Sequence, residues 1–146
     1  MAILPGGSTR AVDDKGRVVL PMRFRASLGE RFIVTRGFDG CVFVFTTDRW
    51  QDLSQRFDDG ATFDPRKVKL QRFLFSAATE VAPDSQGRIA IPQELREWAG
   101  IEPNSEVAII GCANRVEIWA KDAFYGILNT ELSGGQLMAY AAEMGI

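Results

Sequence analysis

A nine-residue segment occurs twice in this 146-residue chain. Residues 13–21 read DDKGRVVLP, and residues 84–92 read DSQGRIAIP. The match continues beyond the prolines, where Phe24 and Arg25 correspond to Leu95 and Arg96, and it resumes after a three-residue insertion. A correspondence that survives an insertion indicates two homologous halves, so the fold must accommodate the same unit twice.

Both halves predict the same order of elements: strand, turn, strand, short helix, hairpin and helix. Pro21 and Pro92 suit the first turn of the two short helices, and Gly29 and Gly100 end them, as helix termini prefer. In the first half we expect strands at 8–13, 17–21, 32–36 and 41–45, and helices at 22–28 and 47–57. In the second half we expect strands at 78–83, 88–92, 106–110 and 115–119, and helices at 93–99 and 121–129.

A basic helix is predicted between the halves, beginning at the sequence DPRKVK. Asp64 suits the N-cap position and Pro65 the first helical position. The sequence therefore predicts four parts: a first repeat at 8–57, a connecting basic helix within 58–78, a second repeat at 79–130, and a Gly-rich, weakly helical tail at 131–146.

Each half has about 55 residues and four short strands, so it exposes strand edges and cannot cover its own sheet. Two such halves paired within one chain would remove those edges. We therefore expect a mainly β, α+β fold: a small interleaved β-barrel surrounded by short helices.

The amino-acid composition argues against several classes of function. The chain has no histidine, which removes the usual general base, the commonest zinc ligand and any Ser–His or Cys–His nucleophile pair. Cys41 and Cys112 fit no metal-binding spacing, and we expect both to be buried, reduced thiols. No carboxylate cluster stands out, so we expect no enzyme, no catalytic or metal-ligating residues and no cofactor.

No apolar run approaches the length that would span a bilayer, and the start MAILPGGSTR lacks the basic leader of a secretory signal. We therefore expect a cytoplasmic protein with no membrane partner.

The formal net charge of −2 conceals a difference between the halves. Residues 1–72 carry 13 basic and 9 acidic side chains, whereas residues 73–146 carry 4 and 10. Two differently solvated surfaces would explain this split, but charge asymmetry also indicates a polyanionic partner.

The repeated segment has parts with different expected roles. Asp13 and Asp84 can accept hydrogen bonds from backbone N–H groups two residues on, and Gly16 and Gly87 can adopt a positive φ, so these four should build the loop. Arg17 and Arg88 follow directly at the start of the next strand.

Two roles are open to these arginines. Each could form an ion pair with the aspartate of its own or the other loop. Alternatively, each could present its guanidinium group to phosphates or guanine edges, which arginine matches with two hydrogen bonds. Nearby Lys15, Arg23 and Arg25 would extend such a DNA-binding patch.

The doubled segment resembles the DxxGR motif of the MraZ family, within the wider AbrB/MazE-like group. The residues around it match as well: LPMRFR and IPQELR after the motifs, the basic helix, and VEIWAKDAF in the second half. The sequence departs from the family at its start, where MAILPGG replaces a compact opening that contains an aromatic residue.

This resemblance implies a double-split, swapped-hairpin β-barrel that assembles into rings. It implies a cytoplasmic, nucleoid-associated regulator, a repressor in our reading, of the bacterial cell-division and cell-wall gene cluster. It also implies binding to double-stranded DNA at short G-rich direct repeats in the promoter, with the DxxGR arginines facing the DNA.

An antitoxin-like protein-interaction module is the alternative function, because AbrB-group folds serve both roles. Such antitoxins usually join a single DNA-binding half to a long acidic tail. Here the second half is another copy of the first, which favours the regulator.

Overall fold

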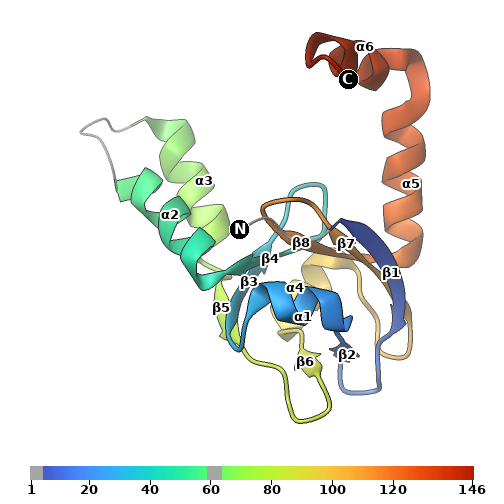
Figure 1. Ribbon diagram of the computed structural model, residues 1–146. Coiled ribbons are helices and arrows are strands. Elements are labelled where there is room, and N and C mark those ends of the chain that lie inside the picture. The colour runs from blue at the N-terminus through green and yellow to red at the C-terminus, as the bar shows by residue number, and fades with distance from the viewer. Residues whose placement is uncertain (1–4, 59–63) are drawn as a thin grey trace.

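The computed structural model describes residues 5–58 and 64–146 and has an α+β fold (Figure 1). The remaining residues, 1–4 and 59–63, include the start of the connecting segment, and they lie outside the described part. The strands are β1 (Gly6–Ala11), β2 (Arg17–Val19), β3 (Phe32–Arg36), β4 (Val42–Thr46), β5 (Thr79–Val81), β6 (Arg88–Ala90), β7 (Glu106–Gly111) and β8 (Val116–Ala120). The helices are α1 (Met22–Leu28), α2 (Thr47–Asp58), α3 (Pro65–Phe75), α4 (Gln93–Ala99), α5 (Lys121–Leu132) and α6 (Gln136–Glu143), with a 3₁₀ turn η1 (Ser133–Gly135) before α6.

The strands form a six-stranded antiparallel sheet in the order β1-β7-β8-β4-β3-β5 and a two-stranded sheet of β2 and β6. Strand β1 of the first half pairs with β7 of the second, with Gly6 opposite Gly111. Reciprocally, β5 of the second half pairs with β3 of the first, with Val81 opposite Phe32. The expected interleaving is therefore present, while closure into a single swapped-hairpin barrel stays a prediction.

The pairings across the two halves follow an approximate two-fold axis. Phe43 lies opposite Glu117 at the middle of the β4–β8 pair, and Val18 lies opposite Ile89 at the middle of the β2–β6 pair. These residues occupy equivalent positions of the repeat. The axis thus passes through both sheets, and the second sheet exists only because the halves meet there.

The main core lies between the two sheets and helices α1 and α4, and both halves contribute to it. Phe24 and Leu95, which correspond in the repeat, are completely buried, as are Val18 and Ile89. Each such side chain stabilises the fold by roughly 1.5–3 kcal/mol relative to exposure. A second cluster beside it joins α2 and α3 to the sheet, with the rings of Trp50 and Phe75 4.8 Å apart.

Most predicted boundaries agree with the structure within one or two residues. Pro21 and Pro92 occupy the N-cap position of α1 and α4 rather than the first turn, with ψ near 140°. Asp64 caps α3 as expected by accepting a hydrogen bond from the Arg66 backbone, and Pro65 follows it. Strand β1 begins two residues before its predicted start, because its partner β7 extends to Gly111, and the largest difference is at α5, which continues to Leu132.

The expectation for the cysteines is confirmed for one of them. Both thiols are free; Cys41 is completely buried, whereas Cys112 is only half-buried. Burial raises the pKa of each thiol above its ordinary value. Among the helices that the structure describes, none has the length and apolar character needed to cross a membrane.

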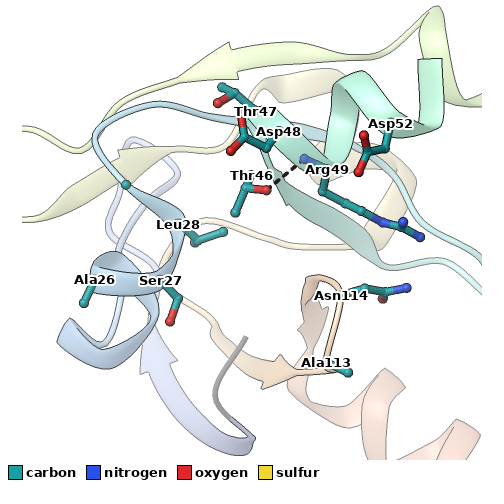
Figure 2. A pocket seen from close by; sticks show the side chains of 11 residues that line it. Ala26, Ser27, Leu28, Thr46, Thr47, Asp48, Arg49, Asp52, Ala113 and Asn114 are labelled. Carbon is teal, nitrogen blue, oxygen red and sulfur yellow. Dashed lines mark hydrogen bonds between the residues drawn. The ribbon is translucent and has the colours of Figure 1, made fainter. Parts of the chain in front are cut away.

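The halves differ at the helix that follows each repeated segment. Trp98 of α4 donates its indole N–H to the carbonyls of Gly37 and Cys41, at 3.1 and 3.0 Å, and so ties α4 to the β3–β4 turn. The corresponding residue of α1 is Ser27, which is too small to fill the equivalent space. A cleft of about 610 Å³ lies there, between α1, the start of α2 and the turn at Ala113 and Asn114 (Figure 2).

Candidate nucleic-acid interface

The aspartate of each repeated segment closes its own loop. The carboxylate of Asp13 accepts hydrogen bonds from the backbone N–H groups of Lys15 and Arg17, at 2.9 and 2.8 Å. Asp84 accepts the equivalent bonds from Gln86 and Arg88, at 2.8 and 3.0 Å. The two loops are therefore built in the same way, and both lie at the lower end of the molecule in Figure 1.

Glycine is required in both loops for two reasons. Gly16 and Gly87 have φ angles of +77° and +78°, in the left-handed region that other residues resist. A Cβ atom at Gly16 would also lie 2.6 Å from the Arg96 side chain, and one at Gly87 would lie 2.5 Å from Arg25. Each loop is thus covered by an arginine from the helix of the opposite half.

The two-stranded sheet brings Arg17 and Arg88 onto one face. Val18 and Ile89 point into the core, so the residues on either side of them alternate outward. Arg17 lies opposite Ala90, and Arg88 lies opposite Val19, which makes the two arginines diagonal neighbours about 7–8 Å apart. The outward face of this ribbon therefore carries a pair of guanidinium groups related by the two-fold axis.

Each of these arginines forms an ion pair with the aspartate of its own loop. Nε of Arg17 donates to Asp13 at 2.7 Å, and Nε of Arg88 donates to Asp84 at 2.8 Å. The side chains of both arginines are about 30% exposed, at 30% and 28%. This is the first of the two alternatives raised by the sequence, and the structure shows it in both loops.

The ion pair engages only one edge of the guanidinium group. Within residues 5–58 and 64–146, the terminal nitrogens Nη1 and Nη2 of Arg17 and Arg88 make no hydrogen bond or ion pair. The carboxylate therefore fixes the direction of each arginine and leaves its outer end open. Because that end is the one that forms paired hydrogen bonds with phosphate or guanine, the ion pair and a DNA contact are compatible.

Hydrogen bonding lowers the pKa values of both aspartates. The bond from the Arg17 backbone N–H, followed by the bond from its side chain and that from Lys15, lowers the pKa of Asp13 to about 2. The equivalent bonds lower the pKa of Asp84. Both loops therefore keep a charged carboxylate, and with it a fixed arginine, throughout the physiological pH range.

The other three predicted residues are placed differently. Lys15 is exposed in the first loop, next to Arg17. Arg23 instead lies against the start of β1, where it donates to the Gly7 carbonyl at 3.3 Å, at the strand end opposite the loop. Arg25 is half-buried against Gly87, and its Nε is buried without a hydrogen-bond partner in the part of the chain that the structure describes.

One residue of this region was not predicted from the sequence. Arg96 covers the Gly16 loop and donates from Nε to the Ile91 carbonyl at 3.0 Å. Its alignment with Arg25 in the repeat was a signal for an equivalent role. The site is therefore a ribbon with two outward arginines, held from behind by a second symmetric pair of arginines.

The arrangement is suited to binding an extended anion. No group of three or more Asp, Glu or Cys side chains that could hold a metal ion occurs among the described residues. A two-stranded β-ribbon fits the major groove of B-form DNA, and bidentate arginine contacts there distinguish guanine from the other bases. The geometry thus offers both a suitable shape and suitable donors.

Comparison with known proteins agrees with the repeat. The model of the MraZ protein family, described as antitoxin-like, matches residues 3–73 and again residues 74–143. A transcriptional regulator MraZ from Acetivibrio thermocellus is 40% identical over 97% of this chain and 98% of its own length. Proteins of the same name from Halothermothrix orenii and Pelotomaculum thermopropionicum are 40% and 44% identical, over 92% and 80% of this chain and 94% and 79% of their own lengths. With two family matches and relatives of this similarity along nearly its whole length, the chain belongs to the MraZ family.

Proposed function

We propose that this chain is a transcriptional regulator that binds double-stranded DNA in a sequence-specific way and is not an enzyme. The outward pair of arginines on the β2–β6 ribbon carries this proposal, because both have their terminal nitrogens open and both point from one face. The name of the relatives, transcriptional regulator, supports the same class of function.

In this proposal Arg17 and Arg88 contact guanine edges or phosphates, and Lys15 adds a phosphate contact beside the first loop. Arg23, on α1, adds its positive charge to the electrostatic field that attracts the DNA. Arg25 supports the second loop from behind, and its charge adds to the attraction for phosphates. Residues 8–57 and 79–130 are the two DNA-binding repeats of a swapped-hairpin barrel. They are joined by the connecting segment 58–78, which contains α3, and are followed by the tail of 131–146.

The resemblance to the family carries the remainder of the proposal. The regulator is a repressor of the cell-division and cell-wall gene cluster, and it binds short G-rich direct repeats in its promoter. It does so as a ring in the cytoplasm, associated with the nucleoid. A ring suits direct repeats, because successive subunits related by rotation present the same ribbon in the same sense.

A gel-shift experiment tests the DNA-binding function. The protein is mixed at physiological salt with the duplex upstream of its own gene, with a scrambled duplex of equal composition, and with a variant of the promoter in which the G-rich repeats are replaced. We expect retention of the promoter duplex alone. Equal retention of all three duplexes would contradict sequence-specific binding, and no retention would favour the antitoxin-like alternative.

A further inference from the structure

The two loops of the repeated segment are attached to each other's half through their backbones. The carbonyl of Gly16 accepts a hydrogen bond from the Ile91 N–H, and the carbonyl of Gly87 accepts one from the Leu20 N–H, both at 3.2 Å. Ile91 lies just before α4, and Leu20 lies just before α1. Each loop is therefore bonded to the entry of the same helix that carries the arginine covering it.

Arg96 completes this attachment at the first loop. The Cδ, Nε and Cζ atoms of its side chain all lie within 2.8 Å of the position that a Cβ atom at Gly16 would occupy. Its Nε donates to the Ile91 carbonyl at 3.0 Å, while the N–H of Ile91 donates to Gly16. The side chain of Arg96 thus lies across the glycine and is fixed to the residue that holds the loop, so the loop is enclosed between Ile91 and Arg96.

The second loop is held in the same way but less firmly. Arg25 covers Gly87 as Arg96 covers Gly16, but the Nε of Arg25 is buried without a hydrogen-bond partner among the described residues. The first loop also has a further bond to the second half, from the Asn104 N–H to the Asp13 carbonyl at 3.3 Å. Of the two covering arginines, Arg96 is therefore the better anchored.

Neither covering arginine has an acidic partner that would explain its charge. Within residues 5–58 and 64–146, Arg25 and Arg96 form no ion pair, although both are half-buried. A half-buried charge without a counter-ion is unfavourable for the fold alone. A planar guanidinium group, however, can lie flat against a loop whose glycine has no side chain. The arginines at these two positions therefore serve the loops rather than the packing of their own helices.

We propose that Arg96 is a positioning residue for Arg17, and that Arg25 is the equivalent positioning residue for Arg88. Each acts across the two halves, by holding the opposite loop in the conformation in which its aspartate–arginine pair directs the guanidinium group outward. The role rests on the proposed function, in which Arg17 and Arg88 contact DNA, and it makes each repeated motif depend on a helix of the other half. Arg96 does this through the loop and without touching the DNA.

Hydrogen exchange of the full-length protein, followed by mass spectrometry, tests the positioning without DNA. Arg96→Met removes the guanidinium group and keeps a long, unbranched side chain. We expect faster exchange of the backbone amides of 14–18 and unchanged exchange at 85–89, and Arg25→Met should have the reverse effect. Faster exchange in both loops, or in neither, would overturn the proposal. If thermal melts show that Arg96→Met does not fold, Arg96→Lys takes its place in this comparison.

Double-mutant cycles on promoter affinity test which loop arginine depends on Arg96. In the parent, Arg96→Met should weaken promoter binding by about tenfold, as expected for residues that act through a shared contact. With Arg17→Ala already present, Arg96→Met should have almost no further effect, because the loop no longer carries the group that Arg96 positions. With Arg88→Ala present instead, the full loss should remain. An equal loss in both backgrounds would mean that Arg96 contacts DNA itself or supports the whole fold, and would overturn the proposal.

Arg96→Lys separates positioning from charge, since lysine keeps the positive charge but lacks the planar group and the Nε that bonds to Ile91. We expect it to weaken promoter binding about as much as Arg96→Met does, and recovery of the parent affinity would overturn the proposal. Arg66→Met is the matched control for the loss of one positive charge, because Arg66 is 91% exposed on α3, away from both loops (Figure 1). It should bind the promoter like the parent; a loss equal to that of Arg96→Met would overturn the proposal.

The two measurements distinguish this proposal from the DNA-binding function. If Arg96→Met speeds exchange in the first loop alone but the parent never retains the promoter, the positioning of the loop is supported and the proposed function is contradicted. If the parent retains the promoter but exchange in the first loop is the same in the parent and in Arg96→Met, the positioning role alone is contradicted.

Discussion

Each loop arginine uses one edge of its guanidinium group for an ion pair. Nε of Arg17 donates to Asp13, and its terminal nitrogens make no hydrogen bond among the described residues. The same holds for Arg88 and Asp84. A side chain fixed in this way loses less conformational freedom when it binds, because much of that freedom was lost on folding.

We expect Arg17→Ala and Arg88→Ala to weaken promoter binding more than they weaken the fold. Each removes a partly exposed ion pair, worth at most about 1 kcal/mol. A bidentate contact with guanine is worth roughly 1–3 kcal/mol, or about five- to 150-fold in affinity. Arg17→Ala should have the larger effect, because Lys15 lies beside it while Ser85 and Gln86 are uncharged. Fluorescence anisotropy and thermal melts provide the two measurements.

Lys15→Ala provides the matched comparison. As a phosphate contact, Lys15 should contribute equally to promoter and scrambled duplex, and its removal should lower the salt dependence by about one counterion per engaged subunit. If the arginine variants lose melting temperature but bind the promoter like the parent, the doubled motif is a folding element only.

The lowered aspartate pKa values predict acid sensitivity. An unfolded aspartate titrates near 3.9, whereas Asp13 titrates at about 2 in the folded protein, and the pKa of Asp84 is lowered in the same direction. The stabilisation from these groups is therefore complete above about pH 4 and is lost as the pH falls toward 2. Asp13→Asn/Asp84→Asn should lower the urea midpoint at pH 7 and show a smaller further loss between pH 4 and 2 than the parent. A parallel pH dependence of the two proteins would contradict this.

The sequence predicted the loop residues correctly in type but could not distinguish their neighbours. Arg23 and Arg25 are two positions apart on α1, so their side chains point to different sides of the helix. One lies against β1 and the other against the Gly87 loop. Proximity along the chain grouped them, and only the packing of α1 separates them.

At the scale of elements, the ribbon of β2 and β6 is what joins the two motifs. Both strands were predicted, since each is a short β-branched run after a turn. Their pairing was not predicted, because each has only three residues and the partner lies about 70 positions away. The register is set by the core, where Val18 and Ile89 must both face inward.

Trp98 is an element-scale contact that predicts a measurable difference between the halves. Trp98→Phe removes the indole donor to the Gly37 and Cys41 carbonyls while keeping a ring of similar shape. We expect a loss of about 1–2 kcal/mol in the free energy of unfolding, measured with urea. Ser27→Ala, at the equivalent position beside the cleft, should change it by no more than about 0.5 kcal/mol. Equal effects would mean that Trp98 does not tie α4 to the turn.

At the scale of the whole molecule, the exchange of strands makes each half depend on the other. Because each half alone would leave strand edges exposed, the sequence predicted that the two halves pair with each other. Which strand would cross over could not be read from a local pattern, since any of four short strands could supply the pairing.

The crossover predicts that neither half folds alone. Fragments 1–61 and 62–146, made separately, should each lack cooperative unfolding. Strand β1 in the first and β5 in the second then have no partner strand, and β3 and β7 each lose one of their two partners. Mixed at equal concentration, they should regain the circular dichroism and the melting transition of the intact chain. Cooperative melting of either fragment alone would show that its pairing across the halves is dispensable.

The distance between β1 and its partner has a consequence during synthesis. The last residue of β1 is made 95 residues before the first residue of β7, which at 5–20 residues per second is a delay of roughly 5–20 s. During that time the β1 segment of the nascent chain has no partner strand. The sequence of β1, GGSTRA, contains no large apolar residue, so it is a poor nucleus for aggregation on the ribosome. Strand β1, which is synthesised longest before its partner, therefore has a sequence that can remain exposed to water.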